Sequence, residues 1–205
     1  MKISGDAVLH APVERVWSAL NDPAVLVQTI PGCERLEPTG PDSYRMVVTA
    51  GVASIKGTYS GQVELAEQQE PNSFLMIASG AGGPGTVSTE VRVRLADAGD
   101  GSTRLSYDAD AVIGGVVAGV GQRMLVGVAK RMAGEFFSAV DDVLTGRSVA
   151  SVPQQVGEGG APAYVSTASR RPGFGGEGFL RGVLVGAAIA LAGVVVGGVL
   201  ARRRS

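Results

Sequence analysis

The sequence feature that most constrains the fold is a succession of segments in which apolar and polar residues alternate. In residues 43–50, SYRMVVTA, the side chains of Tyr44, Met46 and Val48 fall on one side of the chain. Side chains of a β-strand alternate between its two faces, so this pattern predicts a strand with one apolar face. Several such strands in succession are typical of an antiparallel sheet with one face in water. The pattern recurs in residues 56–67, 86–97 and 103–112, while residues 72–79 are apolar on both sides.

Helical patterns stand on either side of this strand region. After a first strand in residues 2–11, apolar residues at helical spacing predict a short helix in residues 11–21. Asp22, as a cap, and Pro23, at the first helical position, predict a second short helix. Residues 114–146 predict an amphipathic helix of about seven turns that ends at a glycine.

The two sides of this long helix differ in character. Its apolar side is expected to lie on the dry face of the sheet and consists of Val117, Val120, Met124, Val128, Met132, Phe136, Val140 and Val143. Its charged side consists of Arg123, Lys130, Arg131, Glu135, Asp141 and Asp142. The order strand, two short helices, about six strands and one long helix predicts an α+β fold of the helix-grip, START-like type, in which a curved antiparallel sheet wraps around the long C-terminal helix.

Small residues gather where the long helix is expected to begin: Gly114, Gly115, Ala118, Gly119 and Gly121. Facing a curved sheet, they either leave an apolar volume unfilled, which would make a ligand cavity, or allow the helix and the sheet to pack closely. The sequence leaves both open. The residues whose position on a face predicts that they line such a cavity are Trp17, Leu20, Leu26, Ile30, Tyr44, Met46, Tyr59, Met76, Tyr107, Val117, Val120, Met124, Val128 and Phe136.

Residues that could carry catalysis are few. The segment from Gly80 to Gly85 has the spacing G-x-G-x-x-G, but a strand pattern follows it where a dinucleotide site needs a helix, so we expect a hairpin loop that could cover the cavity mouth. The single histidine, His10, is expected to be structural or on the surface, and the single cysteine, Cys33, to be a plain small residue. One of each cannot build a Cys/His zinc site. We therefore predict neither catalytic nor metal-binding residues. The inward-facing Tyr44, Tyr59 and Tyr107 could bond a ligand carbonyl or the backbone.

The last third of the chain has a different composition. Residues 146–178 are rich in Gly, Ser, Ala and Pro without any period, which predicts a disordered linker after a folded domain of residues 1–145. Residues 182–201 carry no charge and stand between Arg181 and three final arginines. As a helix this run is about 30 Å long, enough to cross a bilayer, so we expect residues 179–205 to anchor the chain as a single pass, with a buried or shallow helix as the alternative. Small residues at four-residue spacing could let two such helices associate.

Four stretches of the domain together resemble the family of the CoxG subunit of carbon monoxide dehydrogenase, which belongs to the START-like, or SRPBCC, superfamily. They are DPAVL, IPGCERLE, IKGTYSGQVEL and GGVVAGVGQRML, in the order and spacing typical of that family, and the resemblance extends over residues 1–145. The resemblance implies a partner, the molybdenum-containing CO dehydrogenase or a related dehydrogenase, and a link to recruiting that enzyme to the membrane. It implies no catalysis by this chain itself.

Three functions are consistent with these observations. The first is a membrane-tethered carrier of a lipophilic small molecule, a respiratory quinone (menaquinone or ubiquinone), bound without a covalent link. The second is a recruitment protein that binds the dehydrogenase with its cavity packed shut, and the third is a cyclase-type enzyme on the START-like fold. The near-neutral charge, 18 basic against 19 acidic residues, argues against nucleic acid as a partner. Because the first residues lack the apolar core of a secretory signal, we expect the domain at the cytoplasmic face of the membrane.

Overall fold

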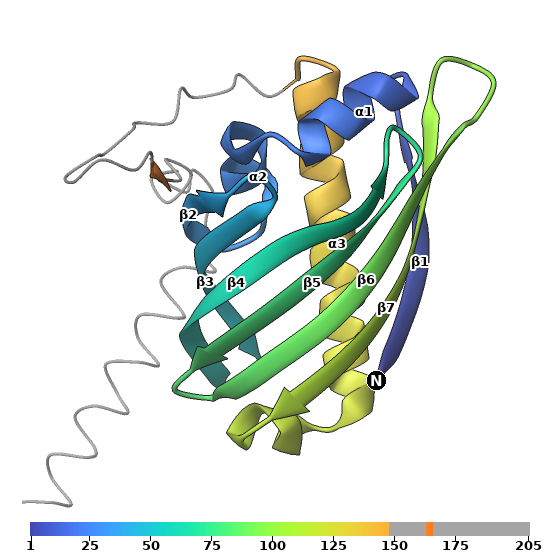
Figure 1. Ribbon diagram of the computed structural model, residues 1–205. Helices are drawn as coiled ribbons and strands as arrows, with labels where there is room; N and C mark the ends of the chain where they lie inside the picture. Colours follow the sequence, from blue (N-terminus) through green and yellow to red (C-terminus); the bar gives the residue numbers. More distant parts are fainter. Residues whose placement is uncertain (148–162, 166–205) are drawn as a thin grey trace, which may run out of the picture. The chain divides into compact units, whose positions relative to one another are not determined.

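A computed structural model of the chain describes residues 1–147 and 163–165 (Figure 1). The order of elements is a strand, two short helices, six strands, a 3₁₀ helix and a long helix. The helices are α1 (Val13–Leu20), α2 (Pro23–Thr29), η1 (Val116–Val120) and α3 (Gln122–Leu144). The strands are β1 (Lys2–Leu9), β2 (Cys33–Gly40), β3 (Ser43–Val52), β4 (Ile55–Gln69), β5 (Ser73–Gly82), β6 (Gly85–Asp97), β7 (Thr103–Gly114) and the short β8 (Tyr164–Val165).

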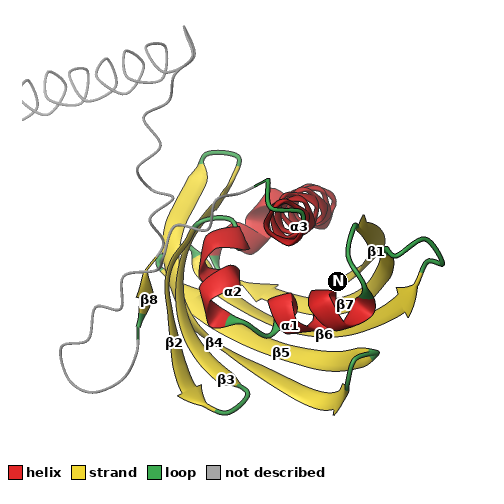
Figure 2. Ribbon diagram, turned by 90° about the horizontal axis from the view of Figure 1, so that it is seen from above, coloured by secondary structure: helices red, strands yellow, loops and turns green. Residues whose placement is uncertain are grey.

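All the strands belong to one antiparallel sheet with the order β1-β7-β6-β5-β4-β3-β2-β8. Neighbours along the chain pair as hairpins from β2 to β7, and β1 closes the other side by pairing with β7. The sheet curls around α3, which lies in its concavity (Figure 2). The predicted helix-grip architecture is confirmed, including the cap of α2, where the Asp22 carboxylate accepts a 2.8 Å hydrogen bond from the Ala24 amide.

The fully buried core lies at one end of the molecule, where α1 and α2 cross between the sheet and the C-terminal part of α3 (Figure 1). We call this the helix end. Trp17 of α1 meets Phe74 of β5 edge to face, with ring centroids 5.7 Å apart. Val140 at the end of α3 is fully buried against the same cluster. Burying these side chains supplies much of the driving force for folding, at roughly 1.5–3 kcal/mol each.

The long helix begins later than the sequence predicts. Residue 114 ends β7, η1 follows, and α3 starts only at Gln122. Gly115 and Gly121 have φ angles of 82° and 91°, in the left-handed region that a continuing helix cannot use. The prediction of one helix over residues 114–146 is therefore wrong in its first two turns, because helical periodicity cannot detect two glycines that reverse the backbone.

The segment predicted as a disordered linker contains a short ordered piece. Tyr164 and Val165 pair with Leu36 and Arg35 as β8, and Ala163 beside them is buried. The prediction of disorder is wrong for these three residues. The rest of the linker after Arg147, and the predicted membrane anchor in residues 179–205, lie outside the described residues. Within residues 1–147 and 163–165, no helix is both long and apolar enough to cross a bilayer.

Candidate functional site

The candidate site is the concave face of the sheet, because α3 covers it incompletely. Of the 23 residues of α3, the buried ones are Val140, Asp141 and Leu144, all in its last turns. The preceding turns, from Gln122 to Ala139, contain no buried residue. A helix packed along its whole length on an apolar sheet would bury one stripe of side chains throughout. Along most of α3, helix and sheet therefore do not close on each other.

The strands show the same change along their length. At the helix end their inward side chains are buried, as in Phe74 and Leu105. Further along, inward residues such as Met76, Ala78 and Val87 are only half-buried, and the outward neighbours of Ala78 and Val87 are exposed. Along this part of the sheet the inner face is still apolar, but α3 covers it less completely. Half-buried apolar side chains on a concave face are what a site for a hydrophobic ligand requires.

The glycines near the start of α3 differ in their surroundings. A methyl group added at Gly115 would come within 2.6 Å of the Gly85 Cα, so this glycine serves close packing. Methyl groups added at Gly119, Gly121 or Gly127 would meet nothing within 4 Å, and these three glycines are exposed to solvent. Close packing therefore explains Gly115, and the other three do not distinguish a cavity from close packing.

The fourteen predicted lining residues differ widely in burial. Met124, which was expected on the sheet side of the helix, is 50% exposed. The buried ones are Trp17, Leu20, Tyr44 and Val117. The half-buried ones are Leu26, Ile30, Met46, Tyr59, Met76, Tyr107, Val120, Val128 and Phe136. Trp17, Leu20 and Tyr44 belong to the packed core at the helix end, whereas the half-buried strand residues lie on the incompletely covered face. That these residues contact a ligand stays a prediction.

Aromatic rings bound this face where β7 and α3 approach each other. Tyr107 of β7 packs against Phe137 of α3, with ring centroids 5.7 Å apart, and Phe136 lies 5.2 Å from Phe137. In the packed core at the helix end, burial and the nearby carboxylates of Asp42 and Asp22 raise the pKa of the Tyr44 phenol. Burial and Asp6 raise the pKa of Tyr107. Both phenols therefore stay protonated at neutral pH and can donate a hydrogen bond.

Two aromatic residues of the described chain, Phe137 and Tyr164, were not among the residues predicted from the sequence. Phe137 was passed over in favour of its neighbour Phe136, but both rings join the cluster because they lie at the edge of the apolar stripe. Tyr164 of β8 packs against the core and pairs with Leu36. Its one sequence signal is a Tyr-Val pair, with high strand propensity, inside a polar segment.

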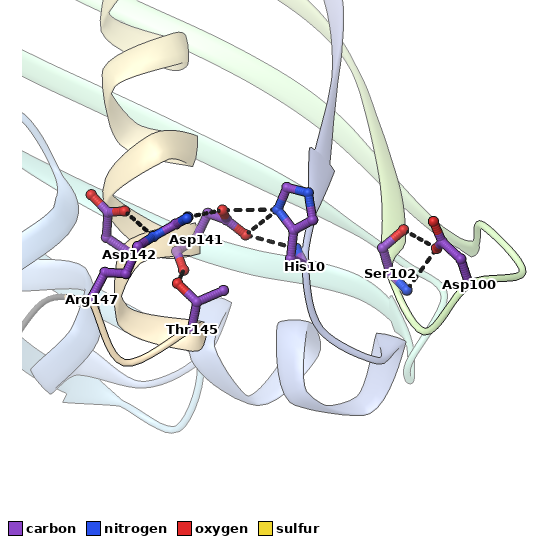
Figure 3. Close-up of polar contacts among 7 residues, drawn as sticks. All are labelled: His10, Asp100, Ser102, Asp141, Asp142, Thr145 and Arg147. Carbon is purple, nitrogen blue, oxygen red and sulfur yellow. Dashed lines mark hydrogen bonds and ion pairs between the residues drawn. The ribbon is translucent and has the colours of Figure 1, made fainter.

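A polar cluster joins the last turn of α3 to the end of β1 (Figure 3). The Asp141 carboxylate accepts hydrogen bonds from the backbone amide of His10 at 2.7 Å and from its ring Nδ1 at 3.0 Å. Arg147 donates to Asp141 at 2.7 Å and to Asp142 at 3.0 Å. Asp141 was expected on the solvent side of the helix and is instead buried, because these donors satisfy it.

The charges of this cluster have a structural explanation. Burial alone would raise the pKa of Asp141, but the hydrogen bonds from His10 and the charges of His10 and Arg147 outweigh it and lower the pKa. The His10 side chain is 65% exposed, and the carboxylate that it contacts, Asp141, is also paired with Arg147. In the part of the chain that the structure describes, no nucleophilic side chain is hydrogen-bonded to His10. Among residues 1–147 and 163–165, no three His, Cys, Asp or Glu side chains gather as metal ligands.

Cys33 is a buried free thiol. Burial raises its pKa to about 11, with the Arg35 carbonyl as hydrogen-bond acceptor partly opposing this and Glu34 adding to it. A thiol of that pKa is almost entirely protonated at neutral pH and is a poor nucleophile.

A hollow of about 470 Å³ lies on the opposite, outer side of the sheet. It is lined by Ser60, Gly61, Gln62, Ser79, Gly80, Ala81, Thr86, Val87, Ser88 and Val112. Serine, threonine, glycine and alanine make up most of this lining, and none of the ten is among the fourteen predicted lining residues. The segment from Gly80 to Gly85, which borders the hollow, forms the β5–β6 hairpin, as predicted.

Comparison with known proteins identifies the family to which the chain belongs. A model of the family of the carbon monoxide dehydrogenase CoxG subunit matches residues 5–145. The chain belongs to this family. The family's name associates the CoxG domain with carbon monoxide dehydrogenase, as an accessory subunit. No curated protein matches the chain.

Solved structures support the same fold. A conserved protein from Geobacillus kaustophilus is 33% identical, covers 80% of this chain and 99% of its own, and superposes with a TM-score of 0.69. A START superfamily protein from Mycobacterium smegmatis is 17% identical, with 72% and 99% covered and a TM-score of 0.56. The Zhui aromatase/cyclase from Streptomyces sp. R1128 is 16% identical, with 74% and 98% covered and a TM-score of 0.55. The last two show the fold alone. The family match therefore carries the association with carbon monoxide dehydrogenase, and the solved structures carry the fold.

Proposed function

We propose that this CoxG protein is a membrane-tethered carrier that takes a respiratory quinone from the bilayer and presents it to a molybdenum-containing CO dehydrogenase or a related enzyme. It would also hold that enzyme at the cytoplasmic face of the membrane. The observation that carries the proposal is the apolar concave face that α3 leaves half covered from Gln122 to Ala139. An apolar ligand bound there would complete a core that the protein alone leaves open.

The chemistry of this face suits a quinone. Its walls are aliphatic and aromatic, and the Tyr107 phenol, whose pKa burial raises above its ordinary value of 10.0, is a hydrogen-bond donor at neutral pH. A quinone presents an apolar ring and tail together with carbonyl oxygens that accept hydrogen bonds. In this arrangement the chain needs no redox group of its own, because the ligand carries the electrons.

The membrane anchor in this proposal is inferred from the sequence. The uncharged run of residues 182–201, with arginines on both sides, has the length of a bilayer-spanning helix. A domain tethered in this way would meet quinone at the membrane surface and meet its enzyme partner on the cytoplasmic side.

The proposal is tested by lipid extraction from the purified full chain, followed by mass spectrometry for quinones. Ala78→Trp places a large ring on the half-buried inner face of β5, and Ser79→Trp places the same ring on the exposed outer face one residue later. We expect the first variant to lose bound quinone at least about tenfold, or ~1.4 kcal/mol, and the second to keep it.

Membrane fractionation of the same variants separates the two roles. A carrier predicts that Ala78→Trp still recruits the dehydrogenase to membranes but no longer supports quinone reduction. A full chain that purifies without quinone and takes up none when quinone is added would leave recruitment as the function.

A further inference from the structure

The end of the domain opposite the core consists of two hairpin turns, the 3₁₀ helix η1 and the start of α3. We call it the hairpin end: the β3–β4 turn (residues 53–54), the β5–β6 turn (residues 83–84), η1, and the first turn of α3 (residues 122–125). It lies at the lower end of the domain in Figure 1. The uncovered stretch of the concave face runs towards this end.

These pieces are in contact with one another. The Val117 amide donates a 3.0 Å hydrogen bond to the Pro84 carbonyl, which ties η1 to the β5–β6 turn. A methyl group added at Gly57, just after the β3–β4 turn, would lie 2.5 Å from the Pro84 ring. Gly115 likewise approaches Gly85. The hairpin end is therefore one continuous surface.

Charge is segregated on this surface. From residue 111 to residue 134 the chain carries three charged side chains, Arg123, Lys130 and Arg131, and all are basic. Residues 46–63, which span the β3–β4 turn, carry Lys56 alone, and residues 71–89, which span the β5–β6 turn, carry none. The hairpin end thus has no acidic residue in a chain that has more acidic than basic residues overall. This contrast favours an anionic partner.

Most of these basic side chains are not paired with a neighbouring acidic side chain. Arg131 is paired with Glu135 at 3.7 Å, but Lys56, Arg123 and Lys130 form no ion pair within the described residues. The carboxylate nearest to Lys56 is that of Glu34, which accepts a 2.6 Å hydrogen bond from the Thr49 hydroxyl beside Thr58 of β4. On the other strands, Asp110 and Glu90 are paired partners further along β7 and β6. Asp110 lies within 3.9 Å of Lys2 and 3.7 Å of the N-terminal ammonium. Those cations offset it.

Large apolar side chains are exposed on the same surface. Val116 of η1 is 69% exposed and Met124 of α3 is 50% exposed. Two of the five exposed large apolar residues of the described chain therefore lie at the hairpin end. Exposed apolar residues bordered by lysine and arginine are the features by which proteins bind an anionic membrane surface.

We propose that the hairpin end is a membrane-docking surface, which binds anionic lipid headgroups through Lys56 and Arg123 and inserts Val116 and Met124 between them. Docked in this way, the domain would turn the uncovered end of its concave face towards the bilayer. A ligand could then pass between lipid and protein without crossing water. Only this last consequence rests on the proposed carrier function, and the docking itself does not.

The test uses the full chain carrying an environment-sensitive fluorophore at Val116→Cys. Because the native Cys33 is buried with a raised pKa, labelling under native conditions is directed to the new thiol. A matched label at Ala96→Cys reports from an exposed position on β6 at the helix end. Both proteins are mixed with vesicles of phosphatidylcholine alone, or of phosphatidylcholine and phosphatidylglycerol in a two-to-one mixture.

We expect the label at position 116 to shift to the blue, and to be quenched by lipid-linked quenchers, on the anionic vesicles only. The label at position 96 should stay in water on both. A tail anchor acts equally on both labelled proteins, so it cannot produce this difference. Equal signals from the two positions would overturn the proposal. So would a position-116 label that stays in water on both vesicles but is shielded by the purified dehydrogenase, since the surface would then bind protein.

Charge variants give a second readout. Lys56→Gln and Arg123→Gln should each weaken the position-116 signal by about fivefold on anionic vesicles. Arg104→Gln removes an exposed basic residue from β7 at the helix end and should leave the signal unchanged. An equal effect of all three would overturn the proposal. Quinone content is measured separately, so docking without bound quinone would remove the carrier function and leave the docking surface standing.

Discussion

The Asp141 carboxylate accepts a 2.7 Å hydrogen bond from the backbone amide of His10, 131 residues earlier in the chain. This contact connects the last turn of the long helix α3 to the end of the first strand β1. Asp141→Ala would leave the part-buried amide of His10 without its acceptor. We expect a loss of about 1–3 kcal/mol in the free energy of unfolding, measured by chemical denaturation. Asp141→Asn keeps an acceptor oxygen and should lose less, and an equal loss in both would contradict this explanation.

The same contact predicts an acid sensitivity. The pKa of Asp141 is lower in the folded protein than its ordinary value of 3.8. A lowered pKa means that the ionised form stabilises the fold fully above pH 3.8, and that this stabilisation is lost as the pH falls below it. The difference in unfolding free energy between the wild type and Asp141→Ala should therefore be constant near neutral pH and shrink below about pH 4. A difference that grew on acidification would show that the pKa is raised instead.

Cys33 should be almost unreactive in the folded protein. Its pKa of about 11, against an ordinary 9.0, leaves roughly a hundredth of the usual thiolate near neutral pH. Alkylation followed by mass spectrometry should proceed at least about a hundredfold more slowly in the folded protein than in denaturant. Cys33→Ser provides the blank. Comparable rates in the two states would mean that the start of β2 opens readily.

Gly5 and Tyr107 form a cross-strand pair in which the ring lies over the glycine. A methyl group at Gly5 would come within 2.7 Å of the tyrosine Oη and 2.9 Å of two ring carbons. Gly5→Ala must therefore push the ring away from Phe137, and we expect a loss of about 1–3 kcal/mol. In Tyr107→Ala the same substitution should cost little, so a double-mutant cycle should be strongly non-additive. Additive effects would show that the ring does not hold this position.

The sequence predicts the architecture well because the fold depends on repeated patterns. Period-two alternation identifies β3, β4, β6 and β7, and the cap at Asp22 marks the start of α2. Each of these signals is local, and many residues repeat it. The START-like grip follows from their order.

The parts that could not be predicted depend on contacts between distant segments. The burial of Asp141 needs His10 and Arg147 beside it, and no helical pattern contains that information. The pairing of Tyr164 with Leu36 joins residues that the linker separates. How far α3 covers the sheet is likewise a matter of tertiary geometry, so the sequence indicates an apolar face but not where it is left open.

That geometry leads to a last prediction, on the glycines of the long helix. Gly127 and Gly134 lie inside α3, where an added methyl group would meet nothing within 4 Å. Alanine has a higher helix propensity than glycine by about 0.8–1.0 kcal/mol, so Gly127→Ala and Gly134→Ala should each raise the free energy of unfolding by up to that amount. Gly115→Ala is the matched opposite, because its φ of 82° and its approach to Gly85 leave no room, and it should destabilise the fold. Chemical denaturation of the three variants measures both signs. Destabilisation by Gly127→Ala would contradict the exposed position of this face of α3.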